Sequence, residues 1–340
     1  MHIGLIAPPW GPVPPGAYGG TEAVVDRLAR GLAGAGHDVL LFTTGDAMCP
    51  VERAWVLEES AGDRIGAVDV ELRHVLHAYE VVKHCDVVHD HTVAGALAVA
   101  WRHPSLPVVL TNHGPFDGAM ADILAAVAER VAIVAISEHH ASTAPAGQVS
   151  RVIHHGIDVD TMPVGDGDGG FALFLGRMTA EKGPARAVEV ARRAEVPLVI
   201  AAKMREKPEV EYFHDEVEHR LGDDARYVGE VDEVTKTKLL GQAVALVNPI
   251  RWPEPFGLVM IEALARGTPV VSFAEGAATE IVEDGVTGFL CHDDDEMVDR
   301  LRRVGDLDRD ACRRAAEARF TTERMVAAHV DLYESVAAGR

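Results

Sequence analysis

The sequence predicts an α/β protein made of two doubly wound domains, each built on a parallel sheet. Short apolar runs alternate with amphipathic stretches along the first half of the chain, and the same alternation restarts after residue 170. Between the halves, the Asp-Gly-Asp-Gly-Gly run at 166–170 is typical of a flexible linker. Ligands of such folds bind beyond the carboxyl ends of the strands, so we expect the two domains to face each other across a cleft.

The expected strands are short apolar runs, as in parallel sheets that are buried on both faces. They are Ile3–Ala7, Val39–Thr43, Val87–His89, Val108–Thr111 and Val131–Ile136 in the first half, and Ala172–Leu175, Pro197–Ala201, Arg226–Val228, Ala245–Asn248 and Pro269–Phe273 in the second. Helical patterns cover Thr21–Leu32 and Phe116–Val127, and the acidic stretch Val51–Val82 is expected to hold one more strand and helix.

Length and linker together give the domain boundaries. A chain of 340 residues is long for one domain and suits two. We expect an N-terminal domain at 1–160, a linker at 161–170 and a C-terminal domain at 171–321. A last helical pattern, Arg309–Ala338, can close against either domain, and its end, residues 322–340, can pack back on the first.

Composition argues against several classes of partner. A net charge of -21 disfavours nucleic acid, and no basic amphipathic helix is present to dock on anionic lipid. No apolar run approaches the roughly 20 residues of a transmembrane helix, and the first residues do not resemble a signal peptide. The four cysteines have no CxxC spacing and are expected to be free thiols in a reducing compartment. We therefore expect a cytoplasmic protein without stable membrane association.

The most informative stretch is 253–262, where Glu254 and Glu262 stand eight positions apart. Two prolines keep its first part extended, and the apolar run from Leu258 predicts a short buried helix. Glu254 should then lie just outside the helix N-terminus and Glu262 about one turn inside, roughly 10 Å away. This separation is too large for sharing a proton and suits holding two ends of one elongated ligand.

The turn between these two carboxylates is a candidate anion site. The amides of Phe256, Gly257 and Leu258 open a helix, where they have no intrahelical acceptors and the helix dipole favours negative charge. Glu262 could accept hydrogen bonds from a diol such as a ribose. A lone glutamate is usually solvated, but a carboxylate within an apolar run is costly unless it has partners.

Three further loops follow expected strands. Gly19 and Gly20 precede a helix and allow a ligand close to the backbone, although a simple tight turn would look the same. Arg177 and Lys182 flank a turn and supply the forked donor and the point charge that suit a diphosphate, unless they are merely surface cations. His113, between Asn112 and Gly114, is a poor core residue at a strand end and could contact a sugar or the reacting centre.

A metal site is not expected despite 17 histidines. His89 and His91 can share a face of a strand, but no third ligand is apparent, and adjacent histidines point to opposite faces. The acidic runs at 166–168 and 293–295 lie in a linker and a turn, where carboxylates are usually solvated. We expect no metal and no other cofactor.

These motifs, in this order, resemble the family 4 glycosyltransferases. The early glycine pair, the GR…EKG run at 176–183 and the PEPFGLVMIEALARGTPVV run at 253–271 span essentially the whole chain. The resemblance implies the GT-B fold, an acceptor-side N-terminal domain and a C-terminal domain that binds the donor. It also implies a retaining, metal-independent hexosyltransferase that uses a nucleotide diphosphate sugar. A UDP-sugar is favoured, with a small-molecule or oligosaccharide acceptor. Compact length and composition are similar to those of antibiotic-pathway members, such as the avilamycin (orthosomycin) pathway.

The resemblance also implies a role for each candidate residue. Donor binding would involve Gly19, Gly20, Arg177, Lys182, Glu230, Val231, Phe256, Gly257, Leu258 and Glu262, and catalysis would involve Glu254, His113, Arg177 and Lys182. Within the first set, Glu262 would hold the ribose and residues 229–231 the base. One departure is His154-His155, where the family usually has Pro-Asn. We expect it to alter hinge or acceptor contacts more than the donor site.

The mechanism and the rival functions follow from the same residues. Glu254 and Glu262 are expected farther apart than the roughly 5 Å of a retaining carboxylate pair. This favours front-face attack, with the leaving phosphate oxygen taking the acceptor proton. The alternatives are a GT-B-like epimerase or phosphorylase, which would need further acid/base groups or a cofactor, and a non-catalytic sugar-nucleotide sensor, which would not need His113. A dehydrogenase is disfavoured because the GxGxxG fingerprint is absent.

Overall fold

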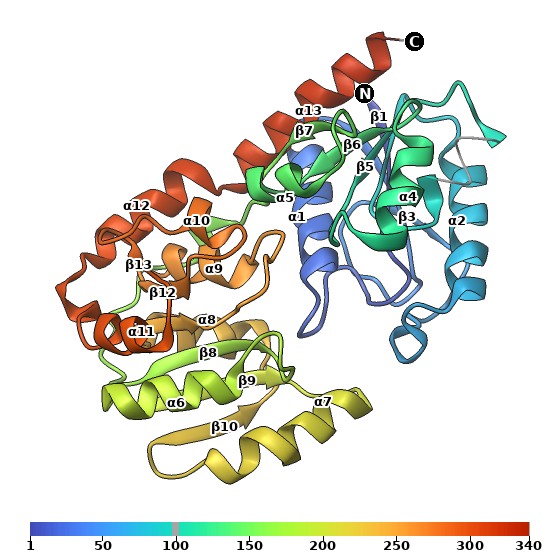
Figure 1. Cartoon of the computed structure of the whole chain (residues 1–340). Helices are drawn as coiled ribbons and strands as arrows, with labels where there is room; N and C mark the ends of the chain where they lie inside the picture. The colour runs from blue at the N-terminus through green and yellow to red at the C-terminus, as the bar shows by residue number, and fades with distance from the viewer. Residues whose placement is uncertain (97–101, 340) are drawn as a thin grey trace. The chain divides into compact units, whose positions relative to one another are not determined.

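The computed structural model divides the chain into two compact units (Figure 1). It describes residues 1–96 and 102–339. The first unit comprises 1–157 and 322–340, and the second comprises 158–321. The C-terminal helical pattern is thus split, with helix α12 (Arg309–Arg319) in the second unit and α13 (Thr322–Ala338) in the first.

The first unit is built on a seven-stranded parallel sheet in the order β3-β2-β1-β4-β5-β6-β7. Its strands are β1 (His2–Ile6), β2 (Asp38–Thr43), β3 (Glu52–Trp55), β4 (Val87–Asp90), β5 (Val108–Thr111), β6 (Ala132–Ala135) and β7 (Val149–Val152). The acidic stretch at 51–82 does contain the extra strand and helix. Strand β7 was not expected, because its sequence Val-Ser-Arg-Val has only half-buried and exposed positions and no apolar run.

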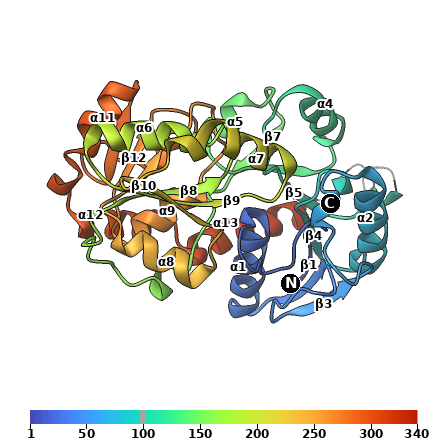
Figure 2. The ribbon, with the colours of Figure 1, turned by 90° about the horizontal axis from the view of Figure 1, so that it is seen from below.

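Helices cover both faces of this sheet, with α1 and α2 on opposite sides (Figure 2). The described helices are α1 (Gly20–Gly34), α2 (Val68–Val82), α4 (Gly118–Val127), α5 (Glu138–Thr143) and α13, with a 3-10 turn at Gly62–Arg64. Helix α13 packs closely on α1, where a Cβ on Gly31 would lie 2.5 Å from Val326 Cγ2. The core between the sheet and α2 is apolar and includes Phe42, Tyr79, Leu110 and Ile133.

The second unit repeats the same topology on a six-stranded parallel sheet in the order β10-β9-β8-β11-β12-β13. Its strands are β8 (Ala172–Arg177), β9 (Leu198–Lys203), β10 (Ala225–Gly229), β11 (Ala245–Asn248), β12 (Val270–Phe273) and β13 (Gly288–Cys291). Strand β13 was missed by the sequence reading, because its apolar part is only three residues long. The expected α/β class, with two doubly wound domains, is confirmed.

Helices also lie on both faces of the second sheet, with α6 opposite α8 and α9 (Figure 2). They are α6 (Pro184–Ala194), α7 (Lys207–Tyr212), α8 (Glu233–Gln242), α9 (Leu258–Ala265), α10 (Ala278–Ile281), α11 (Asp294–Leu301) and α12. Shorter turns are the π-helical Phe213–Val217 and the 3-10 segments Val159–Thr161, Glu218–Arg220 and Val304–Asp306. Among the helices that the structure describes, none is both long and apolar enough to cross a membrane.

Strand order determines where ligands can bind in each unit. The order reverses between β1 and β4 in the first sheet and between β8 and β11 in the second. In open α/β sheets the ligand crevice lies beyond the carboxyl ends of the two strands at this reversal. Arg177 is the last residue of β8, the loops that follow β8 and β11 carry Lys182 and Glu254, and Gly19 follows β1.

Candidate functional site

The loop between β11 and α9 has a fixed backbone around Glu254. The Glu254 carbonyl accepts a 3.1 Å hydrogen bond from the Ala277 amide, and its own amide donates to the Trp252 carbonyl at 2.7 Å. Gly276, with φ of +55°, lies so near that a Cβ there would be 2.5 Å from the Glu254 nitrogen. The close approach of these two segments fixes the backbone position of Glu254, from which its side chain extends. Gly276 was not identified from the sequence.

Gly257 ends this loop and allows α9 to begin. Its φ of +109° is in the left-handed region, which favours glycine, and α9 begins at the next residue, Leu258. Phe256 is buried, with its ring edge-on to Phe320 at 6.3 Å between centroids. Glu254 therefore precedes the helix N-terminus and Glu262 lies one turn inside it, as the sequence reading placed them.

Lys182 and Glu254 are brought together. The Lys182 ammonium donates directly to Glu254 Oε1, and the two side chains are only 13% and 16% exposed. The ammonium also lies 5.8 Å from the centre of the Trp252 ring, a cation–π distance. Arg177 is more open, with 38% of its side chain exposed and a carboxylate of Glu181 at 3.7 Å. Both cations are thus paired with carboxylates of the protein.

Glu262 has a partner that the sequence did not reveal. Its Oε1 accepts a 2.9 Å hydrogen bond from Lys236 Nζ on α8, and the residue is only 4% exposed. Lys236 also contacts Glu233 at 2.7 Å. Burial disfavours the charged ammonium, but these two carboxylates outweigh it and raise the pKa of Lys236 above its usual value. The ammonium of Lys236 therefore stays charged at neutral pH.

Glu230 and Val231 lie in the loop after β10, at the same edge of the sheet. Arg205 donates two hydrogen bonds of 2.7 Å to the Glu230 carboxylate in a bidentate pair. Val231 is half-buried, and Gly229 before it has φ of +85°. Arg205, which follows β9, is a further residue that the sequence reading missed.

Gly19 and Gly20 form the N-terminal end of α1 in the first unit. Gly19 is the residue before the helix, and its φ of 169° is extended and open to any residue. Close packing is what favours glycine here, since a Cβ would lie 2.6 Å from the Pro15 side chain and 3.0 Å from Glu22 Oε2. A carboxylate of the protein itself, that of Glu22, therefore lies beside this helix end.

His113 lies in a rigid turn after β5, also in the first unit. Asn112 Oδ1 accepts from the Gly114 amide at 3.1 Å, and His140 Nε2 donates to the Gly114 carbonyl at 2.8 Å. His140 Nδ1 accepts from the Ile136 amide, so the ring must carry its proton on Nε2. Burial lowers the pKa of His140 to about 4, which keeps it neutral.

The ring of His113 contacts two other histidines. Its Nε2 is 2.9 Å from His91 Nδ1, and the His155 ring stacks on it with centroids 5.3 Å apart. The His154-His155 departure was expected to affect hinge or acceptor contacts. Its second residue, His155, lies directly against the histidine that is predicted to contact the reacting centre.

The structure does not assemble a metal site from the histidines. Both ring nitrogens of His89 are engaged, with Tyr333 Oη at 2.6 Å and Thr111 Oγ1 at 2.7 Å. In the part of the chain that the structure describes, no group of three or more histidine, cysteine or acidic side chains could hold an ion. The four cysteines are buried free thiols.

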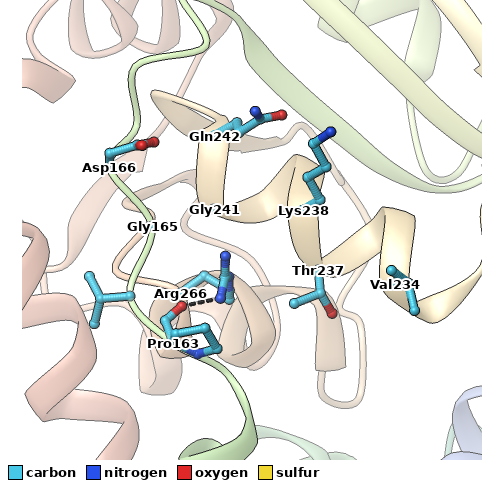
Figure 3. A pocket seen from close by; sticks show the side chains of 10 residues that line it. Pro163, Gly165, Asp166, Val234, Thr237, Lys238, Gly241, Gln242 and Arg266 are labelled. Atoms are coloured by element: carbon cyan, nitrogen blue, oxygen red, sulfur yellow. Dashed lines mark hydrogen bonds between the residues drawn. The ribbon is translucent and has the colours of Figure 1, made fainter.

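One hollow in the second unit, of about 530 Å³, lies away from these residues. It is lined by linker residues 163–166, by α8 and by Arg266, which donates to the Pro163 carbonyl (Figure 3). Each lining segment comes just before a strand: the linker before β8, the end of α8 before β11 and Arg266 before β12. The hollow therefore lies at the amino ends of these strands. The hollow is therefore at the opposite edge of the sheet from Lys182 and Glu254.

Family models match nearly all of the chain. The model described as Glycosyltransferase Family 4 matches residues 18–161, and the one described as Glycosyl transferases group 1 matches residues 164–319. A similar curated protein is the phosphatidyl-myo-inositol mannosyltransferase of Mycolicibacterium smegmatis. It is 28% identical over 94% of this chain and 88% of its own length.

Two solved structures share the fold along the whole chain. AviGT4, a glycosyltransferase involved in avilamycin A biosynthesis, has a TM-score of 0.76 and 24% identity over 100% of this chain and 99% of its own. HepE of Anabaena, solved with UDP and glucose, has a TM-score of 0.76 and 17% identity over 98% and 100%. At these identities the likeness concerns the fold alone. Together with the two models, it shows that this chain is a glycosyltransferase enzyme that belongs to family 4 and has the GT-B fold.

Proposed function

We propose that this enzyme transfers a sugar from a nucleotide diphosphate sugar, with a UDP-sugar favoured, to a soluble acceptor with retention at the anomeric carbon. The observation that carries the proposal is the charge arrangement at the strand reversal of the second unit. Arg177 ends β8 and Lys182 follows it, while Glu254 precedes α9 and Glu262 lies one turn inside it, after β11. A structural neighbour, HepE, was solved with UDP and glucose, which supports this class of donor.

The diphosphate would replace carboxylates as the partner of two cations. Lys182 would exchange Glu254 for a phosphate oxygen, and Arg177 would exchange Glu181. The amides of Phe256, Gly257 and Leu258 would receive the distal phosphate at the start of α9. Glu254, released from Lys182, would then accept a hydrogen bond from a hydroxyl of the donor sugar.

The nucleoside would be held at the other end of this ligand. The Glu262 carboxylate is oriented by the Lys236 ammonium and would accept hydrogen bonds from neighbouring ribose hydroxyls. The base would rest against residues 229–231, where Arg205 fixes Glu230.

The chemistry would follow from charge stabilisation. Departure of the nucleoside diphosphate leaves negative charge on its terminal phosphate, and Arg177, Lys182 and the α9 N-terminus would stabilise that charge without a metal ion. The acceptor hydroxyl would attack from the same face, and its proton would pass to the leaving phosphate oxygen. His113 of the first unit would contact the donor sugar near the reacting carbon.

The charge of the chain favours a soluble acceptor over a lipid. A lipid-docking enzyme needs a basic face, but the two arginines of α1 serve the protein itself. Arg30 pairs with Asp26 at 2.8 Å, and Arg27 is only 7% exposed. With a net charge of -21, we propose a soluble small-molecule or oligosaccharide acceptor. Cytoplasmic oligosaccharide or secondary-metabolite synthesis, including antibiotic synthesis, would suit such an enzyme.

Thermal shift with nucleotides tests the proposal directly. UDP, GDP, ADP and dTDP are compared with and without EDTA, and UDP is expected to stabilise the enzyme equally in both. At one hundred times the dissociation constant the gain should be about 2.7 kcal/mol. No shift with any nucleotide would overturn the assignment of Arg177, Lys182 and Glu262. Slow donor hydrolysis without acceptor would distinguish the transferase from a sugar-nucleotide sensor.

A further inference from the structure

The buried ring of His91 contacts the ring of His113, which is only half-buried. His91 follows β4, is 4% exposed, and places Nδ1 2.9 Å from His113 Nε2. Its other nitrogen, Nε2, is buried with no hydrogen-bond partner among the described residues. Among the residues that the structure describes, the His91 ring therefore forms a hydrogen bond to His113 alone, so the orientation of the His91 ring bears directly on His113.

Both rings are neutral at physiological pH. Burial lowers the pKa of His113 to about 3 and that of His91 well below its usual value, and neighbouring histidines add to the shift in each case. A neutral imidazole has one donor and one acceptor nitrogen. One proton therefore lies between the two facing nitrogens, and it is carried either by His91 or by His113.

The buried Nε2 of His91 decides between these two arrangements. If His113 donated its Nε2 proton, His91 would carry its own proton on Nε2, as a buried N–H group with no acceptor. If His91 donates from Nδ1, its Nε2 is left as a bare lone pair. Orphaned buried donors are rarer in proteins than under-satisfied acceptors, so the second arrangement is favoured.

We propose that His91 is a positioning residue that donates its Nδ1 proton to His113 and thereby keeps the His113 proton on Nδ1. His113 then presents an N–H donor to the substrate. Its ligand would be an oxygen acceptor of the nucleotide sugar, either a sugar hydroxyl or a phosphate oxygen. The proposal rests on the proposed function in assuming that His113 contacts the donor.

The surrounding rings prevent His91 from turning away. His89 lies 4.1 Å from it between ring centroids, and His89 is itself fixed by Tyr333 and Thr111. On the other side, His155 stacks on His113 with ring planes 24° apart. The stack restricts the plane of the His113 ring, and the His91 contact occupies its Nε2, which leaves Nδ1 as the nitrogen not engaged by His91.

Three variants separate this role from simple packing. His91→Phe keeps the ring volume and removes the donor, whereas His91→Asn places an amide near the former Nδ1 and can still donate. His329→Phe is the matched control, since His329 lies in the same cluster but bonds the Met325 carbonyl at 2.8 Å and not His113. We expect kcat to fall roughly tenfold in His91→Phe, to recover largely in His91→Asn and to stay unchanged in His329→Phe.

The tautomer is read independently of activity by ¹⁵N NMR of the histidine rings. In the wild type, His113 should be protonated on Nδ1, and in His91→Phe its proton should move to Nε2 in part of the molecules. A wild-type His113 protonated on Nε2, or a His91→Phe enzyme with full kcat, would overturn the proposal. If the wild type transferred no sugar, the proposed function would fail while the tautomer measurement would still decide the role of His91.

Discussion

Lys236 on α8 donates a 2.9 Å hydrogen bond to Glu262 on α9, which joins two helices through a carboxylate that is 4% exposed. Replacing Lys236 by Met leaves that carboxylate buried without its cation. The free energy of unfolding should fall by about 3 kcal/mol, because a broken buried pair leaves an uncompensated charge. Nucleotide binding should weaken as well. Denaturation and thermal shift with UDP measure the two effects.

Lys238, two positions along the same helix, provides the control. It is exposed and lines the hollow at the other edge of the sheet (Figure 3). Lys238→Met removes the same charge and should change stability by less than about 0.5 kcal/mol. Equal losses in the two variants would show that net charge, and not the Glu262 pair, is responsible.

The ion pair between Lys182 and Glu254 predicts a large catalytic effect. Lys182→Ala removes a cation that would face the leaving diphosphate, and kcat should fall by about 10²- to 10³-fold, as when one preorganised donor is lost. Glu254→Ala should also lower turnover sharply. Steady-state kinetics with the preferred donor gives both values, with Lys207→Ala as the control because that side chain is 85% exposed. Turnover near the wild-type rate in Glu254→Ala would remove this residue from the site.

Gly276 predicts an effect of backbone geometry on activity. Gly276→Ala forces a Cβ to within 2.5 Å of the Glu254 nitrogen and should displace the loop that carries this carboxylate. Gly285→Ala is the matched control, since its φ of +74° is equally left-handed but nothing lies within 4 Å of its Cβ position. Both variants have backbone strain of order 1 kcal/mol, but only Gly276→Ala should lower kcat. Comparable kcat values in the two variants would show that the close packing of Gly276 against the Glu254 backbone does not affect activity.

The features that could be predicted from the sequence are those determined by residues close together in the chain. Glu254, Gly257 and Glu262 were placed correctly around α9, because proline, glycine and an apolar run determine the backbone over ten residues. The parallel sheets were readable for the same reason, except β7 and β13, which lack a long apolar run. Family membership then rested on the order of such local motifs.

The partners of these residues could not be read. Lys236 and Arg205 resemble surface cations in the sequence, and they reach Glu262 and Glu230 only because different strands end at one edge of the sheet. His91 was considered as a metal ligand, whereas the structure bonds it to His113. Long-range pairing depends on register and packing, which a single sequence does not show.

Seven histidines predict that the first unit is sensitive to acid. They are His74, His89, His91, His113, His140, His155 and His329, and burial lowers the pKa of each, to about 4 for His74, His140 and His329 and about 3 for His113. The unfolded chain binds protons near pH 6.5, whereas the native rings do not. Their contribution to stability is therefore complete above that pH and is lost as pH falls toward 4, by up to about 1.4 kcal/mol per pH unit for each ring.

One buried carboxyl opposes this trend, since burial raises the pKa of Asp90 to about 6. Seven rings outweigh it, and the three histidines of the second unit, His214, His219 and His292, are exposed. Lowering the pH from 7.5 to 5 should therefore raise amide hydrogen exchange in α2 and β4 more than in α9 and β12, after correction for intrinsic rates. Equal changes in the two units would contradict the prediction. A Tyr79→Phe variant, which removes the 2.6 Å hydrogen bond to Asp90, checks that this carboxyl does not dominate the profile.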